Sequence, residues 1–166
     1  YTFTYTVSSA TCAPATSTVV ITVLPLPTVS IASNSTVCSG SNGTITFTGT
    51  PNATVTYTVN GGSNQTIVLN VSGTATINRT FTSTTTYSLV SVASSGIPSC
   101  SQVQSGSATI TVLPLPTVTI SSNSTICSGS LATVTFTGTP NATVTYTVNG
   151  GNNQTIVLNA SGTAAV

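Results

Sequence analysis

The stretch GTPNATVTYTVNGG occurs at Gly49–Gly62 and returns letter for letter at Gly138–Gly151, so residue 138 repeats residue 49 at an offset of 89 residues. The same offset carries LPLPTVSI (Leu24–Ile31) onto LPLPTVTI (Leu113–Ile120). A long period repeated this faithfully is typical of a tandem array, in which each repeat is one structural unit.

The repeat divides the chain into three segments. Residues 1–24 are predicted to be the C-terminal strands of a preceding repeat, residues 25–115 a complete repeat, and residues 116–166 the N-terminal half of a following repeat. We therefore expect the sequence to be a segment of a longer protein.

Charge is almost absent from the chain, which contains one Arg (Arg79), no Lys, Asp, Glu or His, and 39% hydrophobic residues. That hydrophobic share is enough to build a core, whereas average domains carry about 25% charged residues. Without a charged field nothing attracts nucleic acid or an anionic membrane, and we expect neither as a partner. No apolar run approaches the roughly 20 residues that a membrane helix needs, so membrane insertion is not expected, and an export signal would lie outside this segment.

Apolar and polar residues alternate with a period of two wherever the chain is not turning, and no stretch shows the helical period of 3.6. Turn signals at Thr50–Asn52 and Asn60–Gly62 separate the runs. The predicted strands are Tyr1–Ser8 and Thr16–Leu24, followed in the complete repeat by Thr28–Ala32, Gly43–Gly49, Ala53–Val59, Asn64–Val71, Thr74–Phe81, Thr84–Ser91 and Ser107–Leu113. Seven short strands per repeat predict an all-β fold of tandem immunoglobulin-like β-sandwich repeats of about 89 residues.

The alternation also predicts which side chains face the core of the complete repeat. The inward set is Ile45, Phe47, Val55, Tyr57, Val59, Ile67, Leu69, Ala75, Ile77, Tyr87, Leu89, Ala108, Ile110 and Val112. The outward set is Thr44, Thr46, Thr54, Thr56, Thr58, Thr109 and Thr111. Tyr87 is either a corner tyrosine whose hydroxyl bonds the backbone or a plain core residue, and Tyr5 is expected to hold the same place in the preceding repeat. Arg79 lies near a strand end, where its head can reach water, and a structural role is expected.

Taken as a set, the motifs of this chain resemble the immunoglobulin-like or PKD-like repeats of very large Bacteroidota surface proteins. The set runs LPLPTVxI, VCSG or ICSG, GTPNATVTYTVNGG, TTTYSLVSV, a loop bearing Cys, and SATITVLPLP, and it covers the whole chain. Such proteins are similar in architecture to gliding-motility adhesins and are typically exported by the type IX route. The resemblance implies an extracellular, cell-surface stalk or adhesin and no catalytic residues. Calcium-stiffened linkers are not expected, because acidic residues are absent.

Few side chains in this sequence can carry chemistry. General acid–base catalysis draws on His, Asp, Glu, Lys, Cys or Tyr, and only four Cys and five Tyr are present. A serine triad cannot form, because the sequence has no residue to act as its base. A calcium site would have no carboxylate ligands, and a zinc site would have no clustered ligands. We therefore predict that the segment is not an enzyme and holds no cofactor or metal.

Two recurring patterns have ordinary explanations beside functional ones. Asn-x-Ser/Thr, the acceptor pattern for N-glycosylation, arises often by chance in a chain so rich in Ser and Thr. Thr-x-Thr runs resemble ice-binding ladders, but outward strand positions explain them equally well, and a sandwich twists. Neither pattern is taken as a functional site.

The function predicted from the sequence is a structural or adhesive extracellular stalk of tandem immunoglobulin-like repeats. Its partners would be adjacent repeats of the same chain, with like chains or surface glycans as further candidates. The alternative is a subunit of a self-assembling filament or sheath, because the strand edges lack the charges that normally block edge pairing. A carbohydrate-binding module ranks last, since the chain has no Trp.

The four cysteines, Cys12, Cys38, Cys100 and Cys127, are the candidate residues for disulfides between repeats. We place Cys38 in the turn after the first strand and Cys100 in the loop before the last strand, at opposite ends of the sandwich. Strands of about eight residues separate those ends by roughly 25 Å, far beyond the reach of a disulfide. Cys38 is therefore expected to face the following repeat and Cys100 the preceding one. A bridge within one repeat, and free thiols, remain open alternatives.

Overall fold

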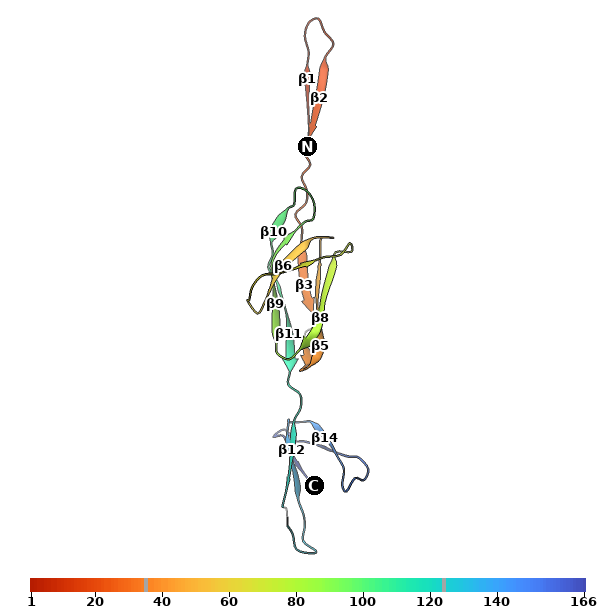
Figure 1. Cartoon of the computed structure of the whole chain (residues 1–166), viewed down its shortest axis with the longest axis vertical. Coiled ribbons are helices and arrows are strands. Elements are labelled where there is room, and N and C mark those ends of the chain that lie inside the picture. Colours follow the sequence, from red (N-terminus) through yellow and green to blue (C-terminus); the bar gives the residue numbers. More distant parts are fainter. Residues whose placement is uncertain (35, 124) are drawn as a thin grey trace. The chain divides into compact units, whose positions relative to one another are not determined.

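The computed structural model describes residues 1–34, 36–123 and 125–166. Contacts divide the chain into two compact units, Tyr1–Val112 and Leu113–Val166, and each is described by itself (Figure 1). All helical or strand structure in these ranges is β-strand, which confirms the predicted all-β class. Thr, Val, Ile and Tyr fill the strands because branched and aromatic side chains suit a pleated, half-buried backbone.

The complete repeat, which begins near Pro27, is a sandwich of two sheets (Figure 1). One sheet has the order β3-β5-β8, and the other has the order β4-β11-β9-β6-β7 with β10 also paired to β9. The strands are β3 (Val29–Ser33), β4 (Thr36–Cys38), β5 (Ser41–Gly49), β6 (Thr54–Val59), β7 (Gln65–Val68), β8 (Thr74–Phe81), β9 (Thr85–Ala93), β10 (Ser101–Val103) and β11 (Ser107–Leu113). Two packed sheets with this strand count form the immunoglobulin-like sandwich that the sequence predicts.

All seven predicted strands are present, and two short ones were not predicted. β4 and β10 have three residues each, too few for a period-two pattern to show. The predicted strand Asn64–Val71 is shortened to Gln65–Val68. β4 lies beside β11, whereas β3 lies beside β5, so the chain changes sheets between them.

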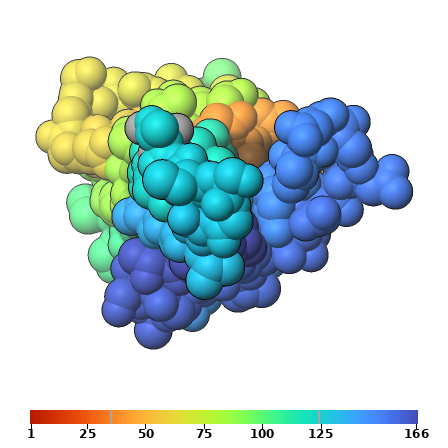
Figure 2. Space-filling view, turned by 90° about the horizontal axis from the view of Figure 1, so that it is seen from below, coloured from red at the N-terminus to blue at the C-terminus, as the bar shows by residue number. Residues whose placement is uncertain are grey.

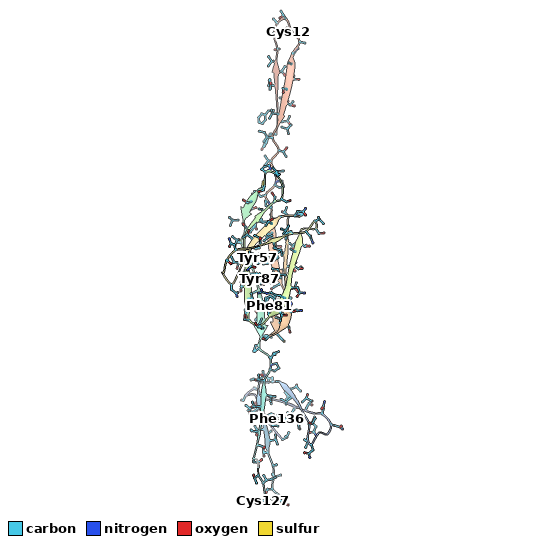
Figure 3. All side chains as sticks on the ribbon, in the orientation of Figure 1. Cys12, Tyr57, Phe81, Tyr87, Cys127 and Phe136 are labelled. Carbon is cyan, nitrogen blue, oxygen red and sulfur yellow. The ribbon has the colours of Figure 1, made fainter. Side chains whose placement is uncertain are left out.

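Both sheets contribute to one core. The residues predicted to face inward are buried or half-buried, and the core also contains Val29, Ala53, Phe81 and Val92. The ring of Phe47 lies 5.2 Å from that of Tyr57, measured between centroids, and Tyr57 lies 5.9 Å from Tyr87. Figure 3 shows Tyr57, Tyr87 and Phe81 gathered inside the sandwich. Aromatic contact across the two sheets therefore forms the centre of the core.

Two glycines form a tight backbone corner where the chain enters the sandwich. The Gly49 N–H donates to the Gly73 carbonyl oxygen at 2.8 Å, and the Thr50 N–H donates to the Thr28 carbonyl oxygen at 2.9 Å. A Cβ on Gly49 would overlap the Thr28 carbonyl oxygen and lie 2.8 Å from the Val29 Cα. Gly73 has a φ of +74°, and a Cβ there would overlap the Gly49 carbonyl oxygen. Both positions therefore require glycine.

Residues before the sandwich form a two-stranded hairpin of β1 (Thr2–Val7) and β2 (Ala15–Val20). Its register places Phe3 opposite Val19, as Tyr87 stands opposite Ala108 in the complete repeat. Val19 and Ala108 are related by the repeat offset, so Phe3 holds the place of Tyr87. The prediction that Tyr5 holds this place is wrong by two residues, because the loop lengths of the two hairpins differ.

The second unit contains two small sheets with the arrangement of the first half of a repeat. One sheet has the order β12-β13-β16, and β14 pairs with β15. The strands are β12 (Val118–Ser122), β13 (Val134–Gly138), β14 (Thr143–Tyr146), β15 (Gln154–Val157) and β16 (Thr163–Ala165). Val118 pairs with Gly138 as Val29 pairs with Gly49. Among the unit's described residues no strand corresponds to β9 or β11.

Candidate functional site

Residues 1–34, 36–123 and 125–166 form no cluster of metal-ligating side chains. These ranges contain no group of three or more His, Cys, Asp or Glu side chains placed to hold a metal ion. They also contain no helix long and apolar enough to cross a membrane. The prediction that the segment is not an enzyme stays a prediction.

Arg79, the one charged side chain, lies against the aromatic core. Its guanidinium carbon is 4.9 Å from the centroid of the Phe81 ring and 5.7 Å from that of Tyr87. The residue itself is exposed, so one side of the guanidinium faces rings while the other reaches water. This contact explains why the chain carries a cation here and supports the structural role predicted for it.

Tyr87 is a core residue, and the corner hydrogen bond is not formed. Its side chain is 1% exposed, and its hydroxyl makes no backbone hydrogen bond within the described part of the chain. Tyr57 does have a polar partner, because its hydroxyl donates to Gln65 Oε1 at 3.2 Å. The two tyrosines thus complete the core rather than a binding site.

Burial raises the pKa of the Tyr57 hydroxyl above its usual 10.0, and the neighbouring Tyr87 raises it further, while Arg79 lowers it. A group whose pKa is higher in the folded state stabilises the fold below the unfolded-state pKa and loses that contribution as pH rises through the folded-state value. Tyr57 therefore contributes to stability at neutral pH and ceases to do so in strong alkali.

We expect the melting temperature to change by less than about 10 °C between roughly pH 4 and 8, because no carboxylate, His or Lys titrates there. Above about pH 10 it should fall, as the unfolded state releases the Tyr57 proton first. Calorimetry across pH, with Tyr57→Phe as the comparison, measures both regions. The variant should show a shallower alkaline fall, and an equally steep one would contradict the assignment to Tyr57.

The four cysteines lie in loops or at strand ends, and no two of them are bridged to one another in this structure. Cys12 is exposed between β1 and β2, and Cys127 is exposed between β12 and β13, as Figure 3 shows. Cys38 is exposed at the end of β4, which corrects its predicted place in a turn. Cys100 is half-buried, and its N–H donates to Ser94 Oγ at 2.9 Å.

Cys38 and Cys100 lie at opposite ends of the sandwich. Gly40, two residues after Cys38, donates its N–H to the Phe81 carbonyl oxygen, close to the start of β9. Cys100 accepts a hydrogen bond from the Ser94 N–H, immediately after the end of β9. The nine residues of β9 separate these ends by roughly 27 Å at ~3.3 Å per residue, which exceeds the span of a disulfide. The geometry excludes a bridge within this repeat, and the bridge between repeats stays a prediction.

In a protein of three complete repeats, we expect non-reducing peptide mapping to join each cysteine equivalent to Cys38 with the cysteine equivalent to Cys100 of the following repeat. The reason is that these thiols lie at the ends of the sandwich where the chain leaves and enters. Mapping after reduction is the control. A peptide joining Cys38 to Cys100 of the same repeat would contradict the prediction, because that bridge requires the two ends of the sandwich to approach by roughly 20 Å.

Several of the asparagines in Asn-x-Ser/Thr patterns have structural tasks. Asn70 Oδ1 accepts from the backbone N–H groups of Ser72 and Thr74 at 2.9 and 3.0 Å. Asn52 adopts a φ of 59°, a backbone conformation that asparagine tolerates better than most residues. Turn formation therefore accounts for these residues without glycosylation.

Comparison with known protein families and with curated proteins finds no match to this chain. The candidate site consequently rests on the geometry alone. Beyond the cysteines, that geometry presents two apolar surfaces that the sequence reasoning did not consider. One is a face of the β1–β2 hairpin, and the other is a hollow in the second unit. The sequence signal for the hairpin face was the strict alternation of Tyr1–Val7, which places the apolar residues of this strand on one side.

Proposed function

We propose that this chain is part of an extracellular stalk or adhesin built of tandem immunoglobulin-like repeats on a bacterial surface. The observation that carries the proposal is the path of the chain through the complete repeat. It enters beside Gly49, where Val29 pairs, and leaves beyond Ile110, which pairs with Thr85 at the start of β9. Those points are at opposite ends of the sandwich, and a chain that enters at one end and leaves at the other supports the proposal of a stalk.

The resemblance of the motifs to Bacteroidota surface repeats supports the same proposal and adds export by the type IX route. The nearly uncharged surface suits a spacer, because Thr, Ser and Asn hydrate it without attracting charged ligands. Adjacent repeats are the proposed partners, and surface glycans or like chains are the candidates for adhesion. The chain performs no catalysis in this proposal.

Electron microscopy of a protein with several complete repeats tests the proposal. Isolated thin rods whose length grows in proportion to repeat number support a stalk. Compact particles whose size does not follow repeat number contradict it. Antibody labelling of intact cells that produce the protein tests the surface location separately.

A filament or sheath subunit is the second candidate, and one observation favours it. β8 is at the edge of its sheet, and its eight residues carry a single charge, Arg79. Natural edge strands usually carry more charge to prevent pairing with other chains. Lateral bundles in the same micrographs would support this candidate over the stalk.

A further inference from the structure

Strand β8 is the longest edge strand of the complete repeat. It has eight residues, whereas the other edge strands have three to five, and within the described part of the chain it pairs only with β5. Figure 1 shows β8 at the margin of the sandwich, and in Figure 2 the yellow-green residues near 78 lie at the upper margin of the molecule. β8 contains no proline and pairs with β5 in an unbroken register, so its other side is a continuous row of backbone groups.

The hydrogen bonds of β5 show which backbone groups of β8 face outward. The Thr50 N–H donates to the Thr28 carbonyl oxygen, so the even-numbered residues of β5 bond β3. The Gly49 N–H donates to the Gly73 carbonyl oxygen, and this bond continues the register of β5 with β8, so the odd-numbered residues of these two strands bond each other. Bonded and non-bonded pairs alternate along an antiparallel ladder. The even-numbered residues of β8 therefore direct their N–H and C=O groups to the open side.

One end of this open side is already occupied by the turn before β8. The Asn70 N–H donates to the Thr74 carbonyl oxygen at 2.9 Å, and the Thr74 N–H donates to Asn70 Oδ1 at 3.0 Å. The outward backbone groups of Thr76, Asn78 and Thr80 have no partner among residues 1–34, 36–123 and 125–166. The open row therefore consists of three alternate residues and is centred on Asn78.

We propose that β8 pairs antiparallel with β8 of a second copy of this chain, about a twofold axis through Asn78. Asn78 then exchanges both of its backbone hydrogen bonds with Asn78 of the second copy, and Thr76 exchanges both of its bonds with Thr80 of that copy. This register gives every open N–H and C=O group of the row a partner and leaves neither strand overhanging. The two sheets that contain β8 thereby join into one continuous sheet.

The side chains of β8 are compatible with this register. On the outer face threonine lies opposite threonine and asparagine opposite asparagine, and such neutral pairs can form hydrogen bonds. On the inner face Arg79 lies opposite Ile77 of the second copy and not opposite its own counterpart. Its guanidinium carbon is 4.9 Å from the centroid of the Phe81 ring, and the residue is exposed, so the charge stays in contact with water. The two arginines are diagonal neighbours about 7–8 Å apart, and salt should screen their repulsion.

A single pairing of this kind is expected to be weak. It buries less surface than a standard protein interface, and we expect a dissociation constant of about 0.1–1 mM. The pairing does not rest on the proposed stalk, and it gives the filament candidate a specific contact. In a tandem array each complete repeat would present its own β8, so two arrays lying side by side would be held at many points.

Sedimentation equilibrium of the 166-residue chain under reducing conditions is the first test. At concentrations up to about 1 mM we expect a dimer of the 16.5 kDa chain in equilibrium with the monomer. Asn78→Pro removes the central outward N–H and takes no bond from β5, so it should weaken the dimer at least about tenfold. Amide hydrogen exchange in the same samples tests the edge directly. The N–H groups of Thr76, Asn78 and Thr80 should exchange more slowly as concentration rises, whereas those of Ile77 and Arg79 should be protected at every concentration, which also shows that each variant is folded.

A charge exchange at Asn78 tests the register and leaves the backbone unchanged. Asn78→Lys and Asn78→Asp each place like charges directly opposite one another, so each variant alone should dimerise more weakly than the parent chain. Their mixture places lysine opposite aspartate and should dimerise several-fold more tightly than either variant alone. Thr44→Lys is the matched control, because Thr44 lies opposite Asn78 on β5, one strand in from the edge, and should leave the dimer unchanged.

Three results would each overturn the pairing. They are a parent chain that stays monomeric at about 1 mM, a folded Asn78→Pro variant that dimerises as the parent does, and a mixture no tighter than its two components. The charge variants decide the question even if the proline variant does not fold. None of these results bears on the stalk, which is tested separately by how rod length follows repeat number.

Discussion

Replacing Phe47 with Ala should lower the free energy of unfolding of the complete repeat by about 3–5 kcal/mol. Phe47 is fully buried, and its ring touches that of Tyr57 in the opposite sheet at 5.2 Å between centroids. Removing it leaves a cavity between the two sheets that neither can fill without giving up its own hydrogen bonds. A domain of this size has a total stability of about 5–15 kcal/mol, so much of that stability would be lost.

Calorimetry should record a fall in melting temperature of more than about 12 °C for this variant. Thr46→Ala is the matched control, because Thr46 is the preceding residue of β5 and faces outward. Its effect should be about 1 kcal/mol or less, as strand propensity alone changes. Similar losses in both variants would contradict the assignment of Phe47 to the centre of the core.

The second large effect is expected for Gly49→Ala, although the change adds a single methyl group. The new Cβ would overlap the Thr28 carbonyl oxygen and press on the Val29 Cα, and both are backbone atoms that cannot rotate away. Relief requires β3 to move from β5, which breaks the hydrogen bonds around Gly49 and Thr50. Overpacking usually costs about 1–3 kcal/mol, and we expect the upper end of that range here.

Gly96→Ala is the control for this change. An added Cβ there meets nothing nearer than the Pro98 carbonyl oxygen at 3.8 Å, so the stability should stay within about 0.5 kcal/mol of the parent chain. Urea unfolding followed by tyrosine fluorescence measures both variants. Equal stability of Gly49→Ala and the parent would mean that the corner is looser than the structure shows.

Alternation along single strands made most of the fold predictable. Ile45, Phe47, Tyr87 and Ile110 face inward as predicted, because a period of two fixes which side of a strand is buried. Leu69 is buried as predicted, but Val71, which has the same parity, is exposed, since β7 ends before the Asn70 turn. Periodicity is a local signal, and it does not say where pairing stops.

Features that depend on pairing between strands far apart in the sequence could not be predicted from alternation along a single strand. β4 forms because β11 offers it a partner, and the same residue types at Thr125–Cys127 form no strand where that partner is absent. The position in the repeat that Phe3 occupies depends on which residue of β2 lies opposite it, and the length of the loop between β1 and β2 sets that register. That Cys38 and Cys100 lie at opposite ends of the sandwich was predictable from strand order, whereas the short strand that ends at Cys38 was not.

The change of sheet between β3 and β4 determines how the complete repeat bears mechanical load. Tension applied where the chain enters passes through β3 into β4, and β4 lies beside β11, through which the chain leaves. In the proposed stalk, tension would act along the strands, and we expect it to load the β4–β11 pairing as a whole. Ser33 Oγ adds a bond of 2.9 Å to the Thr109 carbonyl oxygen of β11 at the same place. We therefore expect that the pairing of β4, a strand of three residues, has to break before the sandwich can unfold under tension.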